Sequence, residues 1–257
     1  MALPFETSSK VYDLLYKDKD YPLEAEFIHR KLVRGDPSAL HILELGSGTG
    51  LHSVLLAGKG HVMDGVDLSA GMVARANKLK SDQPDEIHSK INFHEGDVRS
   101  FKLGAKVDAV VSLFHVVSYQ PQNHQVVEMF QNAREHLKKG GLFLFDVWYG
   151  PALLADLPAV RIKRATDLTM EVTRLCEPEH HVNSCQVDVH YTYLVRDLTT
   201  NEVFENKETH QMRYFFLPEL EYFLTNTGFQ LADSFEWLTG NPLSNKTFGA
   251  CIIAEAV

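Results

Sequence analysis

Residues 40–50 read LHILELGSGTG, a short apolar run that stops at three alternating glycines. The apolar run from Leu40 to Leu45 is typical of a buried strand, and a helical pattern begins at Leu51 and continues to Leu56. Glycine lets the backbone adopt positive φ and approach a ligand closely. We therefore predict a strand, a tight turn and a helix, with a ligand crevice at the carboxyl end of the strand.

The same alternation of strand and helix continues to residue 147. Apolar runs predict strands at 62–68, 91–95, 107–114 and 142–147. Helical spacing predicts helices at 70–80 and 124–138, the second ended by Gly140 and Gly141. This alternation predicts the α/β class, with a Rossmann-like doubly wound parallel sheet.

The pattern changes on both sides of this core. Apolar and polar residues alternate with period two at 160–173, 186–196 and 203–215, which indicates antiparallel strands with one wet face. A helix is expected from Pro218 to Thr227, with closing strands at 229–238 and 248–256. Helical patterns at 10–21 and 23–33 precede the core.

We expect one domain over residues 1–257. Its parts are lid helices at 1–35, a cofactor-binding core at 36–150, an antiparallel β insertion at 155–215, and a closing helix and strands at 216–257. Exposed edges of antiparallel strands are usually covered. We therefore expect the insertion to help form a homodimer.

Composition excludes several classes of partner. The chain has 25 Lys and Arg against 34 Asp and Glu, a net charge of −9, which argues against a nucleic-acid partner. The N-terminal MALPFETSSK lacks the apolar region of a signal peptide, and no apolar stretch is long enough to span a membrane. Cys176, Cys185 and Cys251 are scattered, which favours reduced thiols and a cytoplasmic location. His180 and His181 are adjacent, so no metal site is expected.

Three acidic residues mark the ends of successive strands. Glu44 precedes the glycines, where a carboxylate suits an ammonium group better than a pyrophosphate. Asp67 ends the second strand, where it can accept hydrogen bonds from both ribose hydroxyls. Asp97 follows the third strand, where it can accept from an adenine amine. The glycine spacing GxGxG also departs from the GxGxxG of a dinucleotide site, which disfavours NAD.

This set resembles the S-adenosylmethionine signature of class I methyltransferases. The resemblance implies that Gly46, Gly48 and Gly50 line the methionine and ribose end, and that Asp67 holds the ribose. It also places Met72 near the adenine and lets Asp97 and the Val98 amide read the adenine edge. The cofactor set that we expect further includes Ser47, Leu68 and Leu113.

A narrower resemblance is to the N,N-dimethyltransferases of TDP-linked amino sugars. It rests on VYDLLYKDKDY at 11–21, GDVRSF at 96–101, the pair Asp146 and Trp148, and Glu208-x-His210. In that family the N-terminal segment closes over the cofactor, which marks Tyr12 and Tyr21, and less strongly Tyr16, as residues near it. The chain departs from the family at Tyr119, where a histidine can occur.

The expected acceptor chemistry needs little base catalysis. A neutral amine can attack a sulfonium methyl directly, so most of the rate would come from alignment. An alcohol would need a base, and His115 and His210 keep that alternative open. We expect the acceptor site to be formed by Tyr12, Tyr119, Trp148, Glu208 and His210. Arg164, Arg174 and Arg213 are candidates for binding a diphosphate.

The sequence therefore predicts a small-molecule methyltransferase that uses S-adenosylmethionine, acting on the amine of a nucleotide-linked amino sugar. One alternative is an O- or N-methyltransferase of another small metabolite. A second is a protein that binds S-adenosylmethionine without catalysis and acts as a regulator or scaffold.

Overall fold

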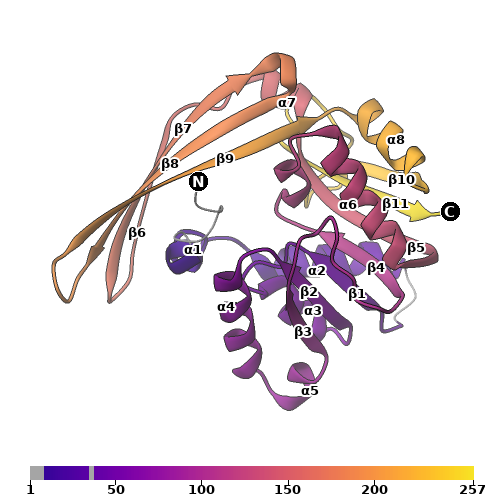
Figure 1. The fold of residues 1–257 in the computed structure, drawn as a ribbon, viewed down its shortest axis with the longest axis horizontal. Coiled ribbons are helices and arrows are strands. Elements are labelled where there is room, and N and C mark those ends of the chain that lie inside the picture. Colours follow the sequence, from indigo (N-terminus) through magenta and orange to yellow (C-terminus); the bar gives the residue numbers. More distant parts are fainter. Residues whose placement is uncertain (1–8, 35–37) are drawn as a thin grey trace.

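A mostly parallel sheet forms the centre of the molecule. The computed structural model describes residues 9–34 and 38–257, and its main sheet runs in the order β3-β2-β1-β4-β5-β11-β10 (Figure 1). The first five strands are parallel to one another, while β11 is antiparallel to β5 and to β10. The strands are β1 (His41–Leu45), β2 (Val62–Asp67), β3 (Ile91–Glu95), β4 (Val107–Ser112), β5 (Leu137–Tyr149), β10 (Phe229–Glu236) and β11 (Gly249–Ala256).

Helices cover both faces of this sheet because its strands are apolar on both sides. In β1, Leu43 and Leu45 pack with Phe130 on one face, whereas Ile42 packs with Ile28 on the other. The first face is covered by α6 (Asn123–His136) and α8 (Leu217–Asn226), and the second by α2 (Tyr21–Val33) and α3 (Leu51–Gly58). The remaining helices are α1 (Ser9–Leu15), α4 (Ala70–Ser81), α5 (Asp85–His88), α7 (Gly150–Ala155) and the 3₁₀ turns η1 (Val116–Tyr119) and η2 (Val182–Ser184).

A four-stranded antiparallel arm extends from one end of the core. It consists of β6 (Arg161–Thr166), β7 (Met170–His181), β8 (Gln186–Asp197) and β9 (Val203–Phe215), and α1 lies beneath it (Figure 1). The arm joins the main sheet through two residue pairs between β5 and β9, Trp148 with Tyr214 and Tyr149 with Phe215. The junction places the inner face of the arm next to the carboxyl ends of the parallel strands.

The predicted fold class is confirmed, but several boundaries were wrong. Gly140 and Gly141 do not end a helix, because α6 already ends at His136 and the glycines lie inside β5. The strand expected at 160–173 is two strands joined by a turn, in which the Asp167 carboxylate accepts from the amides of Thr169 and Met170. The antiparallel insertion expected at 155–215 is not a separate sheet, because β9 pairs with β5 of the main sheet.

The N-terminal part also differs from the expectation. The helix expected over 10–21 ends at Leu15, and a turn leads to Asp20, whose carboxylate accepts from the Leu23 amide at the start of α2. Residues 1–8 of the expected lid segment 1–35 lie outside the described residues. Among the described helices, none has the length and apolar character to cross a membrane.

Candidate active site

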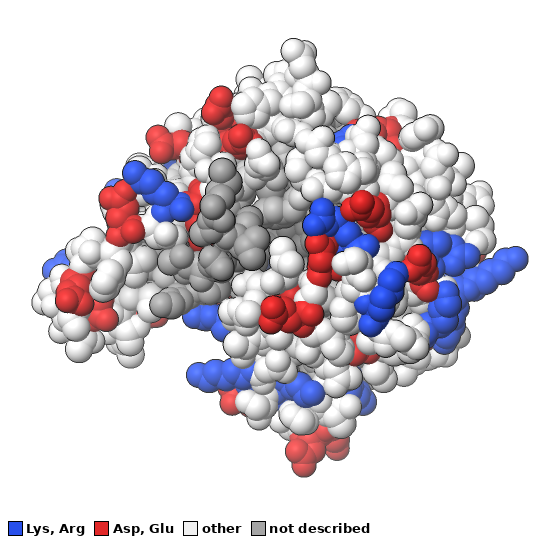
Figure 2. Space-filling view, viewed as in Figure 1, with Lys and Arg blue, Asp and Glu red and all other residues white. Residues whose placement is uncertain are grey.

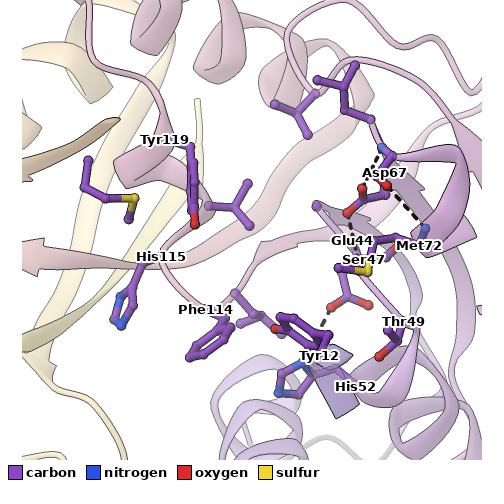
Figure 3. Close-up of a pocket in the computed structure, with 18 of the residues that line it drawn as sticks. Tyr12, Glu44, Ser47, Thr49, His52, Asp67, Met72, Phe114, His115 and Tyr119 are labelled. Atoms are coloured by element: carbon purple, nitrogen blue, oxygen red, sulfur yellow. Dashed lines mark hydrogen bonds and ion pairs between the residues drawn. The ribbon is translucent and has the colours of Figure 1, made fainter. Parts of the chain in front are cut away.

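A cavity of about 600 Å³ opens where the parallel strands end, between the core, α1 and the arm (Figure 3). Its walls come from the glycine turn after β1, the ends of β2, β4 and β5, and the inner face of the arm. Most of the residues predicted for the site line this cavity: Tyr12, Tyr16, Tyr21, Glu44, Gly46, Ser47, Gly48, Asp67, Leu68, Met72, Asp97, Val98, Leu113, His115, Tyr119 and Trp148.

The glycine turn makes a floor for a ligand. Gly46 and Gly48 both have positive φ, +80° and +55°. A Cβ at Gly46 would lie 2.5 Å from Val116, whereas a Cβ at Gly48 would meet nothing within 4 Å, because Gly48 faces open space. Gly50 does not line the cavity, and there a Cβ would lie 2.5 Å from Phe93. The first and third glycines are thus needed for packing, and the middle one leaves room for a bound group.

Asp67 is fixed by the backbone beside this floor. Its carboxylate accepts from the amides of Gly48 and Ser69, each at 2.9 Å (Figure 3). Burial raises the pKa of Asp67, and both amide bonds oppose that rise. A carboxylate offers about four acceptor positions, so two amides leave capacity for two hydroxyl groups. Close by, the Ser47 Oγ is buried against Gly65 of β2 and has no hydrogen-bond partner within the described residues.

Glu44 is a buried acid at the inner end of the cavity. Its side chain is 1% exposed and accepts a hydrogen bond of 2.5 Å from Ser53 Oγ. Burial raises its pKa, while His52, whose Nδ1 lies 3.8 Å away, lowers it. His52 is held in turn by Glu24, 2.7 Å from its Nε2. A buried carboxylate of this kind gains most from an ammonium group placed beside it.

Asp97 is paired with its own neighbour. The Arg99 guanidinium binds both Asp97 oxygens, with Nε at 2.9 and 3.1 Å, and the Arg99 amide also donates to Oδ1 at 2.9 Å. This arginine lowers the pKa of Asp97. The carboxylate therefore stays ionised at the cavity wall with much of its acceptor capacity already used.

Three side chains joined by hydrogen bonds lie at the end of the cavity opposite Glu44. The Tyr119 hydroxyl is 2.8 Å from His210 Nδ1, and His210 Nε2 is 3.1 Å from Glu208. Tyr119 lines the cavity, whereas His210 and Glu208 lie behind it. Burial raises the pKa of Tyr119 well above its ordinary value, so its hydroxyl keeps its proton.

Two consecutive residues after β4 adopt left-handed backbone. Phe114 and His115 have φ of +62° and +65°, which is unusual for non-glycine residues. The buried Asp146 carboxylate holds this turn, because it accepts from the His115 amide at 3.1 Å and lies 2.7 Å from His115 Nδ1. The sequence placed Asp146 at a strand end but did not indicate this pairing.

Aromatic rings of α1 and its following turn cover the cavity. The Tyr16 ring lies 4.7 Å from Tyr12 and 5.1 Å from Phe114, measured between centroids. The Tyr16 hydroxyl accepts from Arg174 of β7 at 2.9 Å. On the other side, Asp13 pairs with Arg75 of α4 at 3.1 Å. The helix is thereby tied to both the arm and the core.

The three arginines proposed for a diphosphate do not line the cavity. Arg213 is buried and paired with Glu219, and Arg164 is exposed. Arg174 donates to the Tyr16 hydroxyl and lies over the rings of Tyr16 and Tyr191. The cavity instead contains residues that the sequence did not single out, chiefly Arg161, Tyr191 and Met212 of the arm, and Phe248. Their positions depend on how the arm folds over the core, which no local pattern encodes.

Comparison with known proteins agrees with this geometry. A model described as a methyltransferase domain matches residues 42–141. The chain is 30% identical to a dTDP-3-amino-3,4,6-trideoxy-alpha-D-glucopyranose N,N-dimethyltransferase of Streptomyces venezuelae over 241 residues, covering 93% of this chain and 94% of the relative. It is 26% identical to a dTDP-3-amino-3,6-dideoxy-alpha-D-glucopyranose N,N-dimethyltransferase of Streptomyces fradiae, covering 93% and 89%.

A solved S-adenosylmethionine-dependent methyltransferase from Clostridium acetobutylicum has the same fold, with a TM-score of 0.81 at 21% identity over 98% of both chains. Fold, cavity and matches define an S-adenosylmethionine-dependent methyltransferase. The chain belongs to the methyltransferase family that includes the N,N-dimethyltransferase of Streptomyces venezuelae. When bound, S-adenosylmethionine supplies a methyl group activated by its sulfonium, and the open space at Gly48 and the acids Glu44 and Asp67 are compatible with it.

Proposed function

We propose that this enzyme methylates the amine of a nucleotide-linked amino sugar. The observation that carries the proposal is the full-length similarity to the Streptomyces venezuelae enzyme, whose name specifies a dTDP-linked amino sugar. The cavity supports it, because its lining extends from the glycine turn to Tyr119, Trp148 and Tyr191. We assign the acceptor to the part of the cavity that these three residues line.

In this proposal the chain's own acids hold the cofactor. Asp67 accepts from the two ribose hydroxyls with the capacity that Gly48 and Ser69 leave. Glu44 faces the ammonium group of the methionine portion, where an ionised carboxylate is favoured by the positive charge. Asp97 and the Val98 amide meet the adenine edge, with Arg99 holding the Asp97 carboxylate in place. Tyr12 and Tyr21, which share a hydrogen bond, cover the opening.

The diphosphate of the acceptor would meet the inner face of the arm. Arg161 lines the cavity there, and Lys163 follows it on the same face of β6. We assign the anion to Arg161 because it is the cation of the arm that reaches the cavity among the described residues. Figure 2 shows acidic and basic side chains intermixed on the visible face, a pattern that suits a small acceptor better than a polyanion.

An alcohol acceptor is the second candidate, and one observation favours it. His115 lines the cavity, and Asp146 lies 2.7 Å from its Nδ1, although this contact lacks the geometry of a hydrogen bond. A histidine beside a buried carboxylate is a candidate base. Formation of S-adenosylhomocysteine tests both candidates, with a dTDP-3-amino-3,6-dideoxyhexose and its 3-hydroxy counterpart as acceptors. We expect turnover of the amino sugar alone, with mass spectrometry counting the methyl groups. Turnover of only the hydroxyl compound would overturn the proposal.

We further propose a cytoplasmic homodimer. The three cysteines are unpaired, which fits a reducing compartment, and β6 leaves one edge of the arm without a partner strand among the described residues. Sedimentation at micromolar concentration should give about twice the mass of the chain, and a monomer would contradict the assembly.

A further inference from the structure

An ionised Glu208 and a neutral His210 would give the hydrogen bonds behind Tyr119 a direction. An ionised Glu208 can only accept, so it requires a proton on His210 Nε2, 3.1 Å away. A neutral imidazole with its proton on Nε2 has an acceptor at Nδ1, which therefore takes the Tyr119 hydroxyl proton at 2.8 Å. The proton of Tyr119 is thus directed away from the cavity, into the arm.

This direction changes what the cavity offers to a ligand. An isolated tyrosine hydroxyl can donate or accept, whereas Tyr119 has already donated to His210. Its oxygen points into the cavity on the side of Phe114 (Figure 3). A hydroxyl oxygen that has donated its proton can act toward a ligand only as an acceptor. His210 is 2% exposed and does not line the cavity, so it can act on an acceptor only through Tyr119.

We propose that Glu208, His210 and Tyr119 form a one-directional relay in which the Tyr119 oxygen accepts an N–H of the methyl acceptor and passes a proton inward. Tyr119 is the residue that touches the acceptor, and His210 and Glu208 are positioning residues. The amine part of this inference rests on the proposed function, whereas the direction of the relay does not.

The relay gives the reaction a balanced route for its proton. The amine nitrogen gains the methyl group, and the electron pair of the broken carbon–sulfur bond remains on sulfur. The resulting ammonium gives one proton to the Tyr119 oxygen while the Tyr119 hydroxyl proton moves to His210 Nδ1. The imidazolium so formed is paired with Glu208. A second methylation needs a neutral amine again, which this transfer supplies.

The direction of the hydrogen bonds in the relay can be measured without a methyl acceptor bound. Long-range ¹H–¹⁵N spectra of the full chain report which imidazole nitrogen carries the proton, and His210→Phe assigns the His210 signals. We expect a protonated Nε2 and an unprotonated, hydrogen-bonded Nδ1 whose signal moves in Tyr119→Phe. Tyr193→Phe is the matched control, because Tyr193 is buried beside His210 but does not line the large cavity. A proton on Nδ1 in the unmodified enzyme would overturn the relay.

Steady-state kinetics with the amino sugar then test the role of the relay in binding the acceptor. Tyr119→Phe should raise KM about 2- to 10-fold, as expected for one lost hydrogen bond between neutral groups. His210→Phe should do the same although it does not line the cavity, and the double variant should be no worse than either single one. Unchanged KM in His210→Phe would refute the relay. If no amino sugar is turned over, the proposed acceptor is wrong, and the spectra still decide the direction.

Discussion

His115 Nδ1 lies 2.7 Å from Oδ2 of Asp146, a carboxylate that is 2% exposed. If the acceptor is an amine, this pair positions the acceptor rather than removing a proton before attack. His115→Gln should then lower turnover by well under the roughly 10²–10⁴-fold that general-base catalysis supplies. The rate should also rise with pH, because a larger fraction of the acceptor amine becomes neutral.

An alcohol acceptor predicts a different outcome for the same variant. Turnover would nearly vanish in His115→Gln, because an alcohol must lose its proton to a base on the enzyme. Steady-state rates of both enzymes across pH distinguish the two cases.

Asp67→Ala should weaken cofactor binding without unfolding the chain. Each ribose hydroxyl would lose a charge-assisted hydrogen bond, and one such bond is worth about 10- to 100-fold in Kd. Calorimetric titration with S-adenosylhomocysteine measures the change. Asp82→Ala, an exposed acid just after α4, is the control and should bind as the unmodified enzyme does. Equal affinity in Asp67→Ala would remove Asp67 from the site.

Tyr12 should act through its ring more than through its hydroxyl. Tyr12→Phe keeps the ring that packs 4.7 Å from Tyr16 and should reduce turnover only mildly. Tyr12→Ala should reduce it more, because it admits water and loosens the alignment of the reactants. Tyr222→Ala, on an exposed part of α8, controls for loss of an aromatic ring. Equal turnover in the Phe and Ala variants would contradict a covering role.

The free energy of unfolding should decrease as the pH falls, because His61 is buried in the folded protein. This side chain is 1% exposed, and its Nδ1 accepts from the Leu40 amide at 3.1 Å. Burial lowers the pKa of His61 to about 4. Between pH 6.5 and about 4 the unfolded chain therefore binds more protons than the folded one, so the free energy of unfolding decreases as pH falls.

Urea unfolding at several pH values tests this linkage. His61→Gln keeps an acceptor for the Leu40 amide and should flatten the dependence on pH in that window. His88→Gln, at an exposed histidine, should leave it unchanged. Equal slopes in all three proteins would show that His61 is not responsible.

The sequence predicted the parallel core well because its signals are local. The run ending at Leu45 and the acids Asp67 and Asp97 stand at strand ends, and strand ends of a parallel sheet meet at one edge. The period-two pattern likewise indicated the antiparallel strands of the arm. Boundaries were less certain, as at Leu15, where helical spacing continued beyond the helix.

The acceptor side could not be predicted to the same depth. Arg161 and Tyr191 reach the cavity only because the arm folds back over the core, so they line the same cavity as Tyr119 despite a large sequence separation. The pairing of Asp97 with Arg99 was also missed, although the two residues are near neighbours. The same local sequence is compatible with a carboxylate that binds the cofactor and with one that binds the neighbouring arginine.

The junction at Trp148 and Tyr149 has an evolutionary consequence. Within the described part of the chain, strand pairing joins the arm to the main sheet at two positions of β5. Hairpins of the arm can therefore lengthen, shorten or change side chains without altering the strands that form the glycine turn. The residues that bind the methyl donor and the residues of the arm that surround the acceptor can therefore diverge at different evolutionary rates. A lineage built on this plan can explore new acceptors while its cofactor site stays constant.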